Sequence, residues 1–179
     1  MMMAAQRQRI RTGSERVLIE SMLADNRTAL IDAVSGLSEQ DARRRLVPSL
    51  TTPIGLIKHA AAAERFWFQH FLAGLDESDC DGPATPGDPS FTVADDETVD
   101  DVIAEFERAS RRSDEIAADY NLEYIKHHPQ AGPVTVRFIL LHAIEEFARH
   151  AGHADILREQ IESTRSFTDG STTDHRGDE

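Results

Sequence analysis

The sequence of 179 residues has little of several features that would place it in a particular class. Its single cysteine, Cys80, excludes an internal disulfide and a zinc site built from paired cysteines. No apolar run approaches the roughly 20 residues of a membrane-spanning helix. Residues 1–12 carry three arginines but lack the apolar core of a secretory signal. These absences predict a cytoplasmic protein.

Positive charge is scarce as well. Lysine and arginine together number 19, against 32 aspartates and glutamates, and the formal net charge is −13. Non-specific nucleic-acid binding needs a surplus of positive side chains to displace phosphate counterions, and anionic membranes attract the same side chains. We therefore expect neither nucleic acid nor a membrane as a partner. A small-molecule substrate is expected instead, although the charge itself says little about that substrate.

The acidic surplus is concentrated in one stretch, residues 76–101, which has ten acidic side chains and no basic one. Three prolines and two glycines in the same stretch are typical of a connection between ordered segments. We expect a loop over about residues 76–97, either a solvated connection or a lid over a site. Cys80 lies among these acids, which disfavour its thiolate, so we assign no nucleophile.

Apolar residues recur at helical spacing in four long segments. These segments cover about residues 13–35, 52–74, 98–120 and 135–162. Ser38 followed by Asp41 is typical of a capping box and predicts a short helix to about Leu46. Thr52 before Pro53 is a helix-start signal.

These segments predict an all-α fold, a four-helix bundle spanning residues 13–162. No segment alternates as a convincing strand, and we expect the residues around His127 and His128 to form a loop. The acidic loop would join the second and third helices and is long enough for a crossover. Residues 1–12 and 163–179 are expected to be flexible ends.

The last long helix carries a stripe of potential metal ligands. At 100° per residue, His142, Glu146, His150 and His153 fall within about 80° of one another. Imidazole nitrogen and carboxylate oxygen both suit zinc, nickel or manganese. A hydrogen-bonded polar seam is the commoner origin of such a stripe. The apolar character of this helix nevertheless favours an ion, because polar groups in a core need partners.

A metal site needs ligands from a second helix. The second helix offers His59, followed by the small residues Ala60 to Ala63, which allow helices to approach closely. Bundle cores build metal sites from side chains on facing helices in this way. Three protein ligands would leave positions open for water or substrate, which is the pattern of catalytic sites.

Two segments resemble the DinB/YfiT-like superfamily, and especially its actinobacterial mini-circle branch. One is the last-helix segment LHAIEEFARHAGHADILRE, residues 141–159, and the other is GLIKHA with AERFWF, within residues 55–68. The resemblance covers about residues 14–162. It implies an up-down-down-up four-helix bundle and one bound divalent metal ion.

The resemblance also implies a ligand set. Carried over position by position, the ligands are His59 on the second helix and the pair Glu146 and His150 on the last. Many members have histidine at both positions of that pair, whereas mycothiol-dependent maleylpyruvate isomerase, a relative, has glutamate and then histidine. We expect zinc. Nickel and manganese are alternatives, because the carboxylate of Glu146 is a harder ligand than the imidazole that many members have at this position.

Other polar residues of the last helix have open roles. His153 is a candidate fourth ligand or proton shuttle. Arg149 could hold an anionic substrate group or pair with Glu145, four residues earlier. His142, two turns before His150, is expected to support a ligand by hydrogen bonding or to contact substrate.

The resemblance implies an enzyme, a thiol-dependent transferase or isomerase that uses a low-molecular-weight thiol as cosubstrate. The chain has 17 arginines but only two lysines, a bias that fits a GC-rich, actinobacterial genome, so mycothiol would be that thiol. A non-catalytic metal-binding or stress-response protein, which could be a homodimer, is the alternative. A hydrolase that uses metal-bound water is a third hypothesis on the same ligands.

Overall fold

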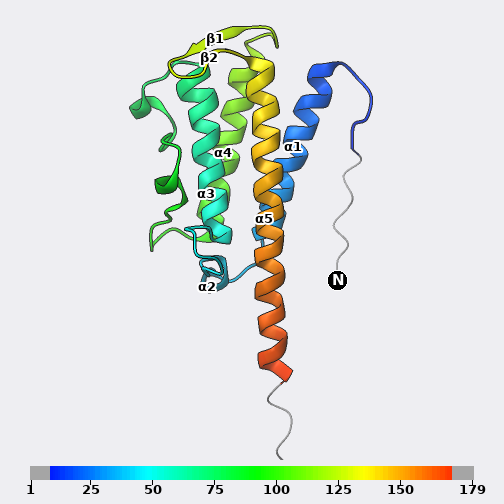
Figure 1. Ribbon diagram of the computed structural model, residues 1–179, viewed down its shortest axis with the longest axis vertical. Helices are drawn as coiled ribbons and strands as arrows, with labels where there is room; N and C mark the ends of the chain where they lie inside the picture. The colour runs from blue at the N-terminus through cyan, green and yellow to red at the C-terminus, as the bar shows by residue number, and fades with distance from the viewer. Residues whose placement is uncertain (1–8, 171–179) are drawn as a thin grey trace, which may run out of the picture.

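A computed structural model describes residues 9–170, and residues 1–8 and 171–179 lie outside the described part. The fold is mostly helical, with five α-helices and one two-stranded sheet (Figure 1). The elements are α1 (Glu15–Val34), α2 (Glu39–Ala42), α3 (Pro53–Glu64), α4 (Val99–Ala118), β1 (Ile125–His128), β2 (Gly132–Thr135) and α5 (Val136–Gly170). None of the helices within residues 9–170 has the length and apolar character that crossing a membrane requires.

The starts of the long helices follow from their caps. The side chains of Ser14, Thr52 and Thr98 accept hydrogen bonds from the first turns of α1, α3 and α4. Each hydroxyl satisfies a backbone N–H that has no partner inside its own helix. The predicted starts near residues 13, 52 and 98 are therefore close to the observed ones.

The end of α5 corrects one prediction. The helix was expected to end at Glu162, yet it continues to Gly170, so the first part of the expected flexible tail is helical. Ile161 is buried, and Arg165 pairs with Asp41 of α2. These tertiary contacts sustain the helix beyond its strongly apolar part. The rest of the predicted tail, and most of the predicted N-terminal segment, lie outside the described residues.

The hairpin of β1 and β2 corrects a second prediction, because the sequence indicated only a loop there. The strands pair antiparallel, with Ile125 opposite Thr135 and His128 opposite Gly132. Each strand has four residues, and only Val134 among them is buried, so no apolar alternation marks them in the sequence.

The second long helix changes its hydrogen bonding halfway along. After α3 the chain continues as a π-helix, η1 (Arg65–Leu72), where Ala73 N donates to Phe68 O at 2.9 Å. The two elements together cover the single helix predicted over residues 52–74. Wider π-type turns are rare and frequently occur at functional sites.

The long helices run in two directions (Figure 1). Near the starts of α1 and α5, Arg137 donates to Glu15 at 2.7 Å, and towards the end of α1, Arg158 donates to Ala33 O at 3.2 Å. These two helices are therefore parallel to each other, while α3 and α4 run the opposite way. The connection from η1 to α4 consequently returns along the length of the helices. It contains two short 3-10 turns, η2 (Glu77–Asp79) and η3 (Asp88–Phe91).

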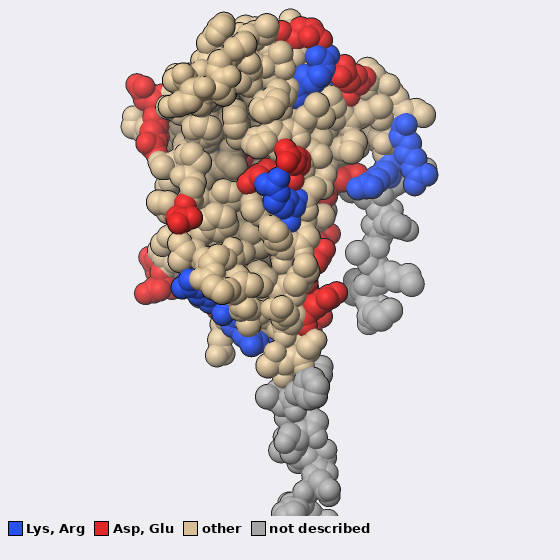
Figure 2. Space-filling view, viewed as in Figure 1, with Lys and Arg blue, Asp and Glu red and all other residues tan. Residues whose placement is uncertain are grey.

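Basic side chains of α3 and η1 hold this acidic connection in place. Arg65, which is only 1% exposed, donates to Asp81 at 2.6 Å and to Glu105 of α4 at 2.6 Å. Lys58 pairs with Glu97 and, at 2.7 Å, with Glu105. Buried charges need such partners. Acidic side chains lie at the left edge of the molecule, on the side of this connection, and also at the top and along the right edge, while much of the face in view is uncharged (Figure 2).

Candidate metal centre

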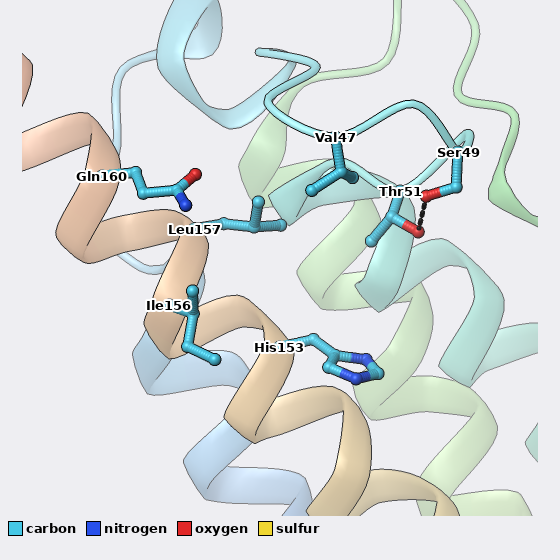
Figure 3. Close-up of a pocket in the computed structure, with 7 residues that line it drawn as sticks. All are labelled: Val47, Ser49, Thr51, His153, Ile156, Leu157 and Gln160. Atoms are coloured by element: carbon cyan, nitrogen blue, oxygen red, sulfur yellow. Dashed lines mark hydrogen bonds between the residues drawn. The ribbon is translucent and has the colours of Figure 1, made fainter.

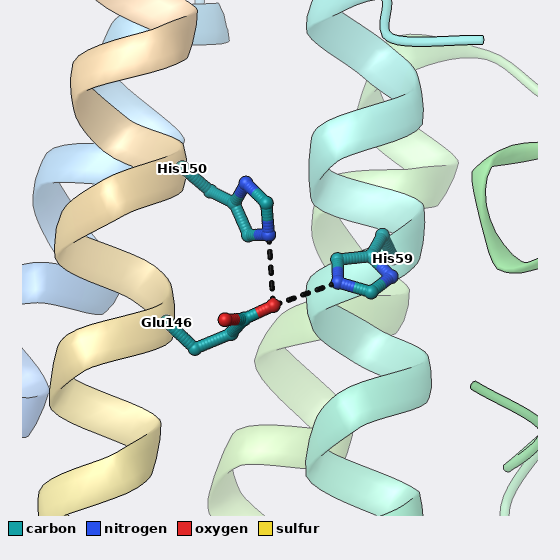
Figure 4. Close-up of side chains that lie close together, drawn as sticks. All are labelled: His59, Glu146 and His150. Atoms are coloured by element: carbon teal, nitrogen blue, oxygen red, sulfur yellow. Dashed lines mark hydrogen bonds and ion pairs between the residues drawn. The ribbon is translucent and has the colours of Figure 1, made fainter. Parts of the chain in front are cut away.

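Three side chains meet between α3 and α5. His59 comes from α3, and Glu146 and His150 come from successive turns of α5 (Figure 4). One ligand atom from each residue lies within 4.8 Å of the other two. Glu146 Oε1 is 3.0 Å from His59 Nε2 and 2.9 Å from His150 Nε2. The structure thus brings together the three residues that the resemblance implied as ligands.

The surroundings keep Glu146 in its charged form. His150 is buried, and the side chains of His59 and Glu146 are only 12% and 18% exposed. Hydrogen bonds from His150 and then His59 outweigh partial burial and hold the pKa of the Glu146 carboxyl well below its usual range. A charged carboxylate is the form that binds a metal ion.

Ser90 of η3 determines which nitrogen of His59 carries the proton. The Ser90 hydroxyl donates to Gly87 O at 2.5 Å, so its oxygen accepts from His59 Nδ1 at 2.7 Å. With Nδ1 protonated, Nε2 donates to Glu146 when the ring is charged and presents a lone pair to it when the ring is neutral. The ring of Phe91 stacks on that of His59 at a centroid distance of 4.2 Å and an interplanar angle of 8°. Together these contacts fix both the tautomer and the orientation of a candidate ligand.

The donor set fits a divalent ion. A lone pair on His59 Nε2 that faces a carboxylate oxygen is repelled unless a proton or a cation lies between them. An ion held by both imidazoles and Glu146 satisfies all three groups, and zinc accepts this combination of nitrogen and oxygen ligands. His150 is less constrained, because its Nδ1 is buried without a hydrogen-bond partner among the described residues.

Arg149 and Glu145 form a polar cluster beside these ligands. Arg149 donates to Glu145 at 2.7 Å, as one of the two predicted roles requires, and to Glu146 Oε2 at 3.2 Å. His142 Nδ1 lies 3.5 Å from Glu145 Oε2. Arg149 thus contacts the carboxylate oxygen of Glu146 that faces neither histidine, and Glu145 joins Arg149 to His142.

His153 faces a different part of the molecule. It lines a separate hollow of about 320 Å³ together with Val47, Thr51 and Leu157 (Figure 3). Its ring centroid is 5.6 Å from that of His150. Among the described residues, the structure does not bring His153 into the group of three ligand atoms.

A cavity of about 360 Å³ opens beside His59 and Glu146. Its other lining residues come from α3, η1, the acidic connection, the hairpin and α5: Ala63, Phe66, Trp67, Pro86, His128 and His142. From the sequence, no role was assigned to His128, and neither Ser90 nor Phe91 was singled out. No local pattern could have shown them, because each depends on where a connection returns to the helices.

The fold and this group of residues define a mostly helical protein with a candidate site for one divalent ion. Residues 18–163 match the family model described as mycothiol-S-transferase, so the chain belongs to that family. This confirms the resemblance to the DinB-like superfamily.

Solved structures support the fold. One similar structure is that of a conserved protein from Enterococcus faecalis, with 15% identity and a TM-score of 0.61 over 85% of this chain and 99% of that chain. At this identity the likeness concerns the fold alone. No curated protein matches the chain.

Proposed function

We propose that the protein is a metal-dependent thiol transferase that joins mycothiol, or a similar low-molecular-weight thiol, to an electrophilic small molecule. One observation carries the proposal: His59, Glu146 and His150 converge beside a cavity large enough for a small molecule. Membership of the mycothiol-S-transferase family supports the choice of thiol. Isomerisation through a transient thiol adduct is the related reaction on the same residues.

A divalent ion held by His59, Glu146 and His150 would supply Lewis acidity and favour the deprotonated form of a thiol near neutral pH. Zinc is the ion we propose, with nickel or manganese as alternatives. Ser90 keeps the Nε2 lone pair of His59 available for this role, and the charge of Glu146 offsets that of the cation. Phe66 and Trp67 form apolar walls that limit water around the reacting thiol.

The thiol proton needs an acceptor close to the reacting groups. His142 lines the same cavity, and its Nδ1 faces Glu145, which would orient the ring with Nε2 free to accept a proton. We assign the proton-accepting role to His142. His153, the residue first considered for it, lines the other hollow.

The finer description of the fold belongs to the same proposal. We infer that α1, α3 with η1, α4 and α5 form an up-down-down-up four-helix bundle, which the parallel pairs α1 with α5 and α3 with α4 support. A cytoplasmic location would suit a thiol cosubstrate, because thiols stay reduced there.

A non-catalytic metal-binding protein is the second candidate. The contact of Arg149 with Glu146 Oε2 favours it, because this arginine occupies one side of the carboxylate. Thiol turnover separates the two candidates.

Metal analysis of the purified protein tests the site. We expect about one zinc per chain in the wild type and in His153→Ala, and loss of the ion in His59→Ala and Glu146→Ala. His153→Ala is a matched control, because it removes an imidazole that belongs to the same helix but is not one of the three candidate ligands. Retention of zinc in both ligand variants would overturn the site. Zinc-loaded protein that consumes no mycothiol with any of a panel of electrophiles would overturn the reaction.

A further inference from the structure

The cavity beside the candidate metal ligands contains a side chain that the proposed thiol chemistry leaves unused. His128, the last residue of β1, lines it together with residues of α3, η1 and α5. The hairpin is tied to the end of η1, because Lys126 Nζ donates to Leu72 O at 2.9 Å. The ring of His128 also packs against Phe71, at a centroid distance of 5.3 Å. Contacts with the end of η1 thus hold the hairpin and the ring of His128 in place.

The turn of the hairpin fixes which nitrogen of His128 carries its proton. The backbone N–H groups of Gln130 and Ala131 both donate to His128 Nδ1 at 3.2 Å. A nitrogen that accepts cannot carry the proton, so the neutral ring is protonated at Nε2. Among the described residues, the hydrogen bonds of the His128 ring involve Nδ1 and leave Nε2 unused. His128 can therefore offer one N–H donor to a ligand in the cavity.

The walls of the cavity favour a flat ligand with apolar faces. Consecutive residues of η1, Phe66 and Trp67, both line it, and Pro86 of the acidic connection also belongs to its lining. None of the described lining residues is lysine or arginine, and the one acid is Glu146. A planar apolar ligand could pack on the indole of Trp67.

Resting on the proposed function, we propose that this cavity binds the electrophile as a planar α,β-unsaturated carbonyl compound. Its flat face lies against Trp67, and its carbonyl oxygen accepts the hydrogen bond of His128 Nε2. Thiol sulfur forms a bond to the β-carbon while the carbon–carbon π pair shifts towards the carbonyl oxygen. The Nε2 donor stabilises the negative charge that develops on that oxygen. The thiol proton ends on the α-carbon, so the product contains every atom of both reactants and no external oxidant or reductant is needed.

The single tryptophan of the chain provides a direct readout of binding. Full-length zinc-loaded protein, without thiol, is titrated with two ligands of similar shape, and Trp67 fluorescence is corrected for ligand absorbance. The ligands are the enone benzylideneacetone and the hydrocarbon propenylbenzene. We expect saturable quenching by the enone and an affinity about fivefold lower for the hydrocarbon, which lacks the acceptor oxygen.

Two variants test the role of His128. His128→Phe keeps a ring in the cavity but removes the donor, and should weaken enone binding about fivefold without weakening hydrocarbon binding. His127→Phe, at the exposed neighbouring position, should bind both ligands as the wild type does. His128→Gln, which retains an N–H donor, should recover part of the enone affinity and serves as the test if His128→Phe does not fold.

Equal affinity for the enone and the hydrocarbon, or unchanged enone binding in folded His128→Phe, would overturn the assignment of the cavity. These measurements contain no thiol, so they stand apart from the test of the reaction. Enone binding without turnover would refute the proposed transferase reaction but not the assignment of the cavity. Turnover restricted to electrophiles without a carbonyl group would refute the assignment of the cavity but not the transferase reaction.

Discussion

Replacing Ser90 with alanine removes the hydroxyl that accepts the His59 Nδ1 proton at 2.7 Å. Ser90 is 8% exposed, so water has little access to replace the hydroxyl. Leaving a buried donor unpaired costs about 1–3 kcal/mol. Since about 1.4 kcal/mol corresponds to a factor of ten, zinc should bind roughly 5- to 150-fold more weakly. Changes to groups that support metal ligands typically cost about 10–100-fold in affinity, which overlaps this range.

The dissociation constant for zinc is measured by competition with a coloured chelator at neutral pH. Circular dichroism checks that each variant is folded. Ser113→Ala is the matched control, because this buried hydroxyl of α4 has no hydrogen-bond partner among the described residues and is not one of the residues around His59. We expect the control to bind zinc as the wild type does. A folded Ser90→Ala variant with wild-type zinc affinity would refute the claim that Ser90 fixes the ligand.

Two further predictions concern stability, both measured by urea unfolding. In metal-free protein, His150 and His59 hold the pKa of Glu146 below its ordinary value of 4.5. The charged carboxylate therefore stabilises the fold fully above pH 4.5, and this stabilisation is lost as the pH falls from 4.5 through the lowered pKa. The stability difference between the wild type and Glu146→Gln should therefore shrink in acid, and a constant difference would contradict this account. A Cβ at Gly82 would lie 2.7 Å from Arg65 Cζ, so Gly82→Ala should cost about 1–3 kcal/mol. Gly152→Ala, with open space around it, should be neutral or stabilise by up to about 1 kcal/mol.

The parts of the molecule that the sequence predicts well are those set by local chemistry. Caps at Ser14, Thr52 and Thr98 place the starts of three helices, because each hydroxyl bonds to backbone within its own first turn. The spacing of Glu146 and His150 likewise places them on neighbouring turns of one helix. Helix geometry alone determines these features.

Features that depend on distant segments could not be predicted in the same way. His59 joins the other two ligands only because α3 faces α5, and it was assigned through a resemblance to a family. Ser90 and His128 reach the site from a connection and a hairpin whose sequences have no regular period. The helical extension to Gly170 depends on contacts such as that between Arg165 and Asp41.

Most acids of the acidic connection are exposed to solvent, yet the connection is also tied to the helices. Asp81 and Glu97 pair with Arg65 and Lys58. Lys58 directly precedes His59, so one turn of α3 holds the connection on one side and presents a candidate ligand to α5 on the other. The same connection carries Ser90 back to the ring of His59. Its acids therefore hold in place the segment that fixes the ligand, and loosening those ion pairs should weaken metal binding without touching a ligand.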